Sequence, residues 1–192
     1  LAVCAQHLDS DRYEGFLQRL IEWKDDSLAD HIGLWRLLAV TGNKSRAARL
    51  VEQLSARPAS AQEAVNLAEI LAELGLLERG VSLSKQCIAE FGYAPNLWII
   101  YAEQLIEAKQ FEELRRFASE IRQNERAKAD LLAYSYYMDG RAELAMARQV
   151  NAAAAFEKLV NSQFSFPNLS LSVAKGLLRG GYPDVACEVQ AK

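Results

Sequence analysis

Glycine and proline are scarce in this sequence, with 10 and 4 residues among 192. Both residue types interrupt helices, so their scarcity leaves room for long helical segments. No segment alternates polar and apolar residues with the period of two that is typical of strands. Alanine, leucine, glutamate and arginine, which favour helices, are abundant instead. The composition therefore predicts an all-α protein without strands.

Long apolar runs and a strong excess of one charge are also missing. No stretch of about 18 residues is apolar throughout, so no membrane span is expected. The net charge of −3 gives no reason to expect nucleic acid as a partner. Apolar residues nevertheless make up 51% of the chain, which is enough for a soluble protein with a buried core.

The chain has three cysteines, Cys4, Cys87 and Cys187. Their odd number and wide spacing argue against a disulfide framework and against a metal site. Cys4 and Cys87 fall on positions that the helical pattern buries, and neither has a clear basic neighbour to activate the thiol. We expect a reducing compartment, the cytoplasm, with the periplasm as the alternative.

Motifs that support catalysis are absent as well. The sequence contains no HExxH, GxxxxGK[ST], GxSxG or GxGxxG pattern. His7 and His31 fall near packing positions of predicted helices. The acidic pairs Asp25-Asp26 and Glu112-Glu113 are poor catalytic couples, because neighbours on a helix point about 100° apart. We therefore predict a protein that is not an enzyme and that holds no metal and no cofactor.

What the sequence has in plenty is self-similarity. The stretches PNLWIIYAEQL, from Pro95, and PNLSLSVAKGL, from Pro167, share their first three residues and a later alanine and leucine. A further copy lies between them, and three more, two of them weaker, precede them. Each copy is aligned on one residue, which we call its anchor, at spacings of 30 to 41 residues: Ala5, Trp35, Ala68, Ala102, Ala133 and Ala174.

Each copy is predicted to fold as a hairpin of two helices. In the fourth copy, apolar residues recur at i, i+3, i+4 and i+7 from Trp98, which places Ala102 and Leu105 on one face of a helix. Turns are expected near residues 41–43, 74–76, 108–110, 139–141 and 180–182. In the fifth copy, a long second helix from Arg141 to Asn161 would account for the wide spacing before Ala174.

The pattern around the anchors resembles the tetratricopeptide repeat, which is typically about 34 residues long. That repeat has an aromatic residue four positions before the anchor, as at Trp98. It has leucine or tyrosine three positions after the anchor, matched by Leu71, Leu105, Tyr136 and Leu177. It has a second small residue twelve positions after the anchor, matched by Gly80, Ala145 and Ala186 but not by Leu114.

This resemblance implies one repeat domain over residues 1–192. The expected architecture is a right-handed superhelix, or α-solenoid, of about six antiparallel hairpins. Ala102, in the best-matching copy, is expected to be tightly packed. The sequence opens inside a predicted helix and closes within another, so we expect a fragment of a longer chain. Exposed repeat faces at the two ends are expected to favour self-association.

The resemblance also implies a non-catalytic scaffold that binds a protein or peptide in a concave groove. Positions one, four and five after the anchor face that groove in the family. The candidate groove residues are Glu69, Glu73, Glu103, Glu107, Tyr134, Tyr137, Met138, Lys175 and Arg179. The four glutamates predict an acidic middle that suits a basic peptide. Packing inside the fifth hairpin is an equal alternative for the two tyrosines and the methionine.

The pathway stays open at this point. The alanine-rich composition, with arginine favoured over lysine, points to a bacterial source, where such arrays often serve secretion, pilus or polysaccharide assembly. One alternative is the interaction arm of a larger enzyme or transcription regulator. Another is an RNA-binding helical repeat, against which the net charge of −3 and the acidic groove positions argue.

Overall fold

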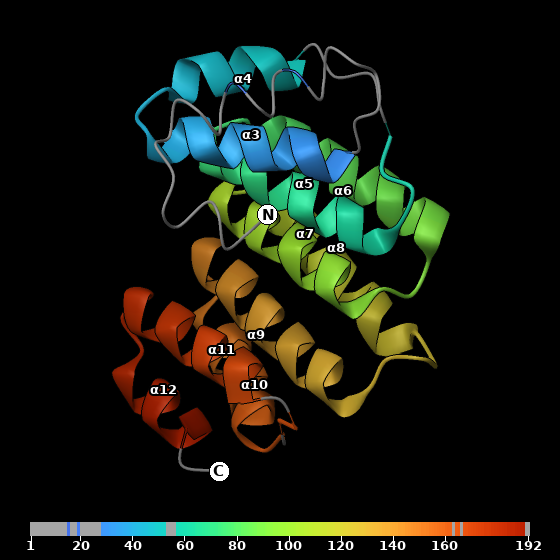
Figure 1. Ribbon diagram of the computed structural model, residues 1–192. Coiled ribbons are helices and arrows are strands. Elements are labelled where there is room, and N and C mark those ends of the chain that lie inside the picture. Colours follow the sequence, from blue (N-terminus) through green and yellow to red (C-terminus); the bar gives the residue numbers. More distant parts are fainter. Residues whose placement is uncertain are drawn as a thin grey trace. The chain divides into compact units, whose positions relative to one another are not determined.

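The computed structural model describes residues 15, 19, 28–52, 57–162, 164–165 and 167–190. Within these ranges all regular structure is helical and no strand occurs, which confirms the all-α prediction for this part of the chain. The helices of the described part (Figure 1) are α3 (Leu28–Val40), α4 (Lys44–Glu52), α5 (Ala61–Glu73), α6 (Leu77–Phe91), α7 (Pro95–Glu107), α8 (Phe111–Gln123), α9 (Ala129–Ala145), α10 (Gln149–Val160), α11 (Pro167–Arg179) and α12 (Pro183–Gln190). The first predicted copy, around Ala5, lies outside the described residues.

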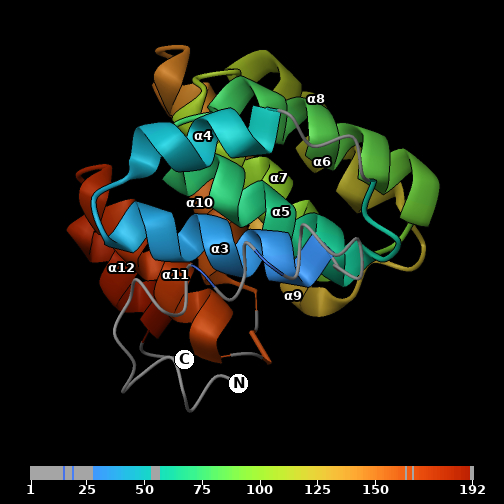
Figure 2. The ribbon, with the colours of Figure 1, turned by 45° about the horizontal axis from the view of Figure 1, so that its top comes forward.

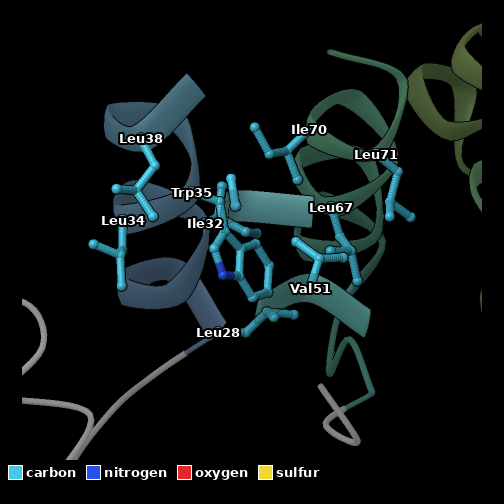
Figure 3. Packing of buried hydrophobic residues seen from close by; sticks show 10 residues of the cluster. Leu28, Ile32, Leu34, Trp35, Leu38, Val51, Leu67, Ile70 and Leu71 are labelled. Carbon is cyan, nitrogen blue, oxygen red and sulfur yellow. The ribbon is translucent and has the colours of Figure 1, made fainter. Parts of the chain in front are cut away.

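The chain divides within α7 into two compact units, Leu1–Gln104 and Leu105–Lys192, and each is described by itself. In the first unit, α3 packs on α4 and α5, and α5 packs on α6 (Figure 1, Figure 2). Figure 3 shows Trp35 of α3 directed toward α5, in a cluster of buried apolar side chains from α3, α4 and α5. The antiparallel hairpins predicted here are therefore present.

A second cluster of the first unit joins α5, α6 and the start of α7 through Val65, Cys87 and Leu97. The buried amide of Gln104 completes this contact. Its Nε2 donates to the carbonyl oxygen of Ala68 at 3.0 Å, and its Oε1 accepts from the Ser84 hydroxyl at 2.8 Å. Both polar atoms of the buried Gln104 amide therefore have a hydrogen-bond partner. The bond to Ala68 holds α7 against α5 at this anchor.

In the second unit, α9 is the central helix, since it packs against α8, α10 and α11. The helix α12 packs against α11 and also touches α10. All five predicted anchors that lie in the described part of the chain are buried: Trp35, Ala68, Ala102, Ala133 and Ala174. The prediction that Ala102 is tightly packed agrees with its complete burial.

Four of the five predicted turns are confirmed, and they share one geometry. The residue seven positions after the anchor has a positive φ, as in Gly42 (87°), Gly75 (80°), Lys109 (57°) and Gly181 (85°). Its N–H donates to the carbonyl four positions after the anchor, and the next N–H donates to the carbonyl three positions after it. This pair of bonds is the Schellman motif, which closes the end of a helix.

The fifth turn is not at residues 139–141, so that prediction is wrong. The helix α9 runs through Asp139 and Gly140 as far as Ala145, and α10 begins at Gln149 rather than at residue 141. The Schellman motif lies at residues 146–148 instead. Ala147 has a φ of 59°, and its N–H donates to the Leu144 carbonyl at 2.9 Å. The second helix is therefore short, and the extra length belongs to α9, with 17 residues against 13 in the other first helices.

The position of this turn moves the anchor of the fifth hairpin from Ala133 to Gly140, which is buried. The described anchors then follow one another at spacings of 33, 34, 38 and 34 residues. The second small residue of this hairpin becomes Ala152 in place of Ala145, and Ala152 is buried whereas Ala145 is exposed. A Cβ at Gly140 would overlap the ring of Phe156 on α10. Glycine at this anchor therefore serves the contact between α9 and α10 rather than a turn.

The turn at Ala147 makes a testable prediction. A left-handed conformation costs a residue with a Cβ about 1–2 kcal/mol relative to its usual backbone. We expect Ala147→Gly to raise the free energy of unfolding by about 0.5–1 kcal/mol, measured by chemical denaturation. The control is Ala154→Gly on the exposed face of α10, which should lower it by about 1 kcal/mol. Equal losses for both variants would contradict the turn at residues 146–148.

Candidate functional site

The repeat register defines a surface on the first helices, made of the positions one, four and five after each anchor. We call it the first-helix surface. In the first unit it includes Arg36, Ala39, Val40, Glu69, Ala72, Glu73 and Glu103, and in the second unit Arg141, Leu144, Ala145, Lys175, Leu178 and Arg179. All of these residues are partly or fully exposed. The residue three positions after each anchor, in contrast, is buried in all five described hairpins.

Glutamates of this surface lie where the sequence predicted them. In the first unit, Glu69 accepts from Nη2 of Arg36 at 2.7 Å, and both side chains are about 40% exposed. This ion pair joins the same position of two successive first helices, α3 and α5. An exposed pair of this kind contributes little stability, about 0–1 kcal/mol. The pair does neutralise Glu69, while Glu73 is a further acidic group of the first unit's surface and is exposed.

The remaining predicted residues of acidic or basic type are also accessible. Glu107 is exposed at the C-terminal end of α7. Lys175 and Arg179 are exposed on α11, one turn apart, with the apolar Leu178 between them at 54% exposure. Apart from Glu107, which belongs to the second unit, the charged residues of that unit's first-helix surface are therefore basic, with an apolar residue beside them.

Tyr134, Tyr137 and Met138 are fully buried, so the prediction that they line an exposed groove is wrong. The cause is the anchor, which lies seven residues later than the sequence indicated. The rings of Tyr134 and Tyr137 pack together with centroids 5.5 Å apart. The alternative, packing inside the fifth hairpin, is the one that the structure shows.

Arg141 takes the place on the surface that the sequence predicted for Tyr134. Its Nη1 donates to the hydroxyl of Tyr137 and to the carbonyl oxygen of Gly176, both at 3.0 Å. A Cβ at Gly176 would overlap that same hydroxyl. Arg141 thus fastens α9 to α11, and Gly176 permits their close approach.

A cluster of charged residues on α8, α9 and α10 escaped the sequence interpretation. Its centre is Glu143, only 7% exposed, at the position three after the anchor. The other four hairpins carry a buried leucine there: Leu38, Leu71, Leu105 and Leu177. Glu143 accepts from Arg115 at 3.2 Å and from the Asn151 amide at 3.2 Å, and Arg148 lies 3.7 Å away. With Gly140 as the anchor, the sequence places Glu143 at a position that is buried in the other hairpins, and this signal would have predicted a buried carboxylate.

Further ion pairs surround Glu143. They join Arg122 to Asp139 at 3.0 Å, Arg116 to Glu113 at 2.7 Å and Arg148 to Glu112 at 3.9 Å. The charges lining the cleft between α8 and α9, about 530 Å³ in volume, are therefore largely matched within the protein.

The cysteines and histidines of the described residues have structural surroundings. Burial raises the pKa of the Cys87 thiol above its ordinary value, and the nearby Glu90 carboxylate raises it further, so the unreactive thiol form is favoured. Cys187 is exposed on α12. His31 stacks on Trp35 with ring centroids 5.6 Å apart. Cys4, His7 and the pair Asp25-Asp26 lie outside the described residues.

Metal binding and membrane insertion find no support among the described residues. No group of three or more His, Cys, Asp or Glu side chains there is arranged to hold a metal ion. None of the described helices combines the length and the apolar character that crossing a membrane requires.

Comparison with known proteins gives likeness to solved structures alone. No family model matches the chain, and no curated protein matches it. The solved structures to which it is similar include MamA of MSR-1, with 15% identity over 90% of this chain and 93% of that chain and a TM-score of 0.48. MamA of AMB-1 has 14% identity over 84% and 87%, with a TM-score of 0.48. MamA (41-end) from Desulfovibrio magneticus RS-1 has 17% identity over 85% and 93%, with a TM-score of 0.49.

The buried carboxylate of Glu143 makes a second prediction. Glu143→Ala leaves Arg115, Arg148 and Asn151 without their acceptor and opens a cavity, so we expect a loss of about 2–3 kcal/mol in the free energy of unfolding. Glu143→Leu restores the residue type of the other hairpins and should stay within about 1 kcal/mol of the wild type, because a packed apolar side chain can replace a buried ion pair. Thermal and urea unfolding measure both changes. A leucine variant as unstable as the alanine variant would show that the ion pairs themselves stabilise the hairpin.

Proposed function

We propose that this protein is a non-catalytic protein–protein interaction scaffold that binds a partner's peptide or helix on its first-helix surface. One observation supports this most directly. The positions one, four and five after the anchor are accessible in all five described hairpins, whatever residue type they carry. A surface that recurs at the same place in each repeat can follow an extended partner along successive hairpins.

The chemistry of the surface favours a basic partner segment for the first unit. Glu73 and Glu103 supply carboxylates, and Val40, which is 86% exposed, supplies apolar area on the same first-helix surface. A helix or peptide with lysine or arginine beside apolar residues complements this arrangement. Nucleic acid does not, since phosphates would meet carboxylates.

The surface of the second unit favours the opposite charge. Arg141, Lys175 and Arg179 are basic, and Leu144 and Leu178 are partly exposed beside them. An acidic segment with apolar side chains is the matching partner for this unit. Because the two surfaces differ in the sign of their charge, the scaffold could bind two different segments, either of one partner or of two partners.

The proposed setting is an assembly in a bacterial cell, such as secretion, pilus or polysaccharide assembly, in the cytoplasm or the periplasm. The interaction arm of a larger enzyme or transcription regulator is the second candidate, because its surface would look the same. Self-association through the ends of the repeat array is a further expectation, and an RNA-binding repeat is disfavoured by the carboxylates of Glu73 and Glu103.

Charge reversal tests the proposed surface. We expect Glu73→Lys, Glu103→Lys and Glu107→Lys, combined in one variant, to lose partners that the wild type retains in pull-downs from the native lysate. Glu69 stays unchanged, because its reversal would place two cations beside each other at Arg36. The matched control reverses three exposed glutamates of second helices: Glu52, Glu78 and Glu120.

The control variant has the same net charge and should recover the wild-type partners with the same salt sensitivity. Thermal melts of both variants check that the fold is intact. Equal recovery by both variants would show that the acidic part of the first-helix surface is not the binding site.

A further inference from the structure

A groove runs between two second helices of the second unit, α10 and α12. Its volume is about 660 Å³, within the range of sites that take up several side chains of a ligand. Ala152, Ala153 and Val160 line it from α10, and Val185 lines it from α12. Apart from Leu144, which also belongs to the first-helix surface, its lining comes from these two second helices and the residues next to them.

Aromatic rings lie at the groove. Phe156 of α10 is buried, and its ring packs against the ring of Tyr182 with centroids 5.3 Å apart. Tyr182 precedes α12 and is half-buried. The Phe156 ring packs against α9, where it occupies the space that the missing side chain of Gly140 leaves open. The groove therefore combines this aromatic pair with apolar residues and with the polar residues Gln149 and Asn161.

The rim of the groove carries negative charge. Glu157 of α10 and Glu188 of α12 belong to its lining, and both are exposed. Neither forms an ion pair with another residue of the described part. The neighbouring cleft of α8 and α9 differs in this respect, since arginines there match the carboxylates, as in the pair of Arg115 with Glu143.

The outer face of α10 extends the apolar area of the groove. Val150 is 83% exposed, and Ala153 and Ala154 are exposed one turn further on. Alanines let a second helix approach closely, to about 8–10 Å between helix axes. An exposed valine followed by small residues is costly for a surface that only meets water and is suited to one that meets another helix.

We propose that the groove between α10 and α12 is a second docking site, and that it takes a basic amphipathic helix of a partner protein. One or more apolar side chains of that helix enter the groove beside Phe156 and Tyr182. Lysine or arginine side chains of the same helix pair with Glu157 and Glu188 at the rim. The charge of the rim selects against acidic helices.

The test uses a fluorescein-labelled peptide of about 18 residues, made of leucine and lysine in a helical amphipathic pattern. Its binding to the whole chain is measured by fluorescence anisotropy. We expect saturable binding of this basic probe, and binding at least about tenfold weaker for the same design with glutamate in place of lysine. Equal affinity for both peptides, or no binding of the basic one, would overturn the proposal.

Two exposed alanines supply a matched pair of variants. Ala153→Arg fills the groove and opposes the charge of the probe, so we expect at least an about tenfold loss of affinity. Ala89→Arg adds the same side chain on α6 of the first unit, away from the groove, and should keep the wild-type affinity. Thermal melts confirm that both variants fold. Equal affinity of the two variants would place the probe elsewhere.

A further arm separates this site from the first-helix surface. The variant with Glu73, Glu103 and Glu107 changed to lysine should lose any binding of the basic probe to the first-helix surface and keep the binding that Ala153→Arg removes. Loss of binding in that variant, with Ala153→Arg unaffected, would place the probe on the first-helix surface and overturn the groove. Photo-cross-links from the probe are expected on α10 and α12.

Discussion

The contact that each hairpin depends on is the one at its anchor, where the anchor residue is buried between helices. The anchor sets the turn, because the Schellman motif follows six to eight residues later in all five described hairpins. It also sets the surface, because the positions one, four and five after it are accessible in each of them. In the fifth hairpin the anchor is Gly140, and the ring of Phe156 leaves no room for any larger residue. The fold and the candidate binding surface therefore follow from a single register.

Four hairpins could be predicted from the sequence because anchor and turn residues agree. Gly42, Gly75 and Gly181 stand at the left-handed position of their turns. The fifth hairpin gives the opposite signals. The residue with the left-handed conformation is Ala147, and alanine is not typical of turns. Asp139-Gly140, in contrast, is a common turn pair, but here it lies inside a helix. Tertiary packing overrides the local preference, since Asp139 pairs with Arg122 and Gly140 receives the Phe156 ring.

Whether a candidate site residue could be predicted also depended on the anchor of its hairpin. The accessible glutamates and basic residues could be predicted wherever the anchor was correct, as at Glu73 and Lys175. An error of seven residues at one anchor placed the buried Tyr134 on the surface and hid Glu143, whose burial among arginines is visible only in three dimensions. The groove of α10 and α12 depends on how far apart two helices lie, a quantity that periodicity does not contain. These candidate sites differ from one another in charge and in apolar content.

The most direct test of this account is a double-mutant cycle on Gly140 and Phe156, measured as free energy of unfolding. Gly140→Ala should destabilise the protein by about 1–3 kcal/mol, because the new methyl group overlaps the ring. In the background of Phe156→Leu the same substitution should cost at least about 1 kcal/mol less. Gly33→Ala on α3, where no atom lies within 4 Å of the added Cβ, is the control and should stabilise by about 0.5–1 kcal/mol. If Gly140→Ala stabilises the protein as this control does, whether or not Phe156 is present, Gly140 is not the anchor and the register is contradicted.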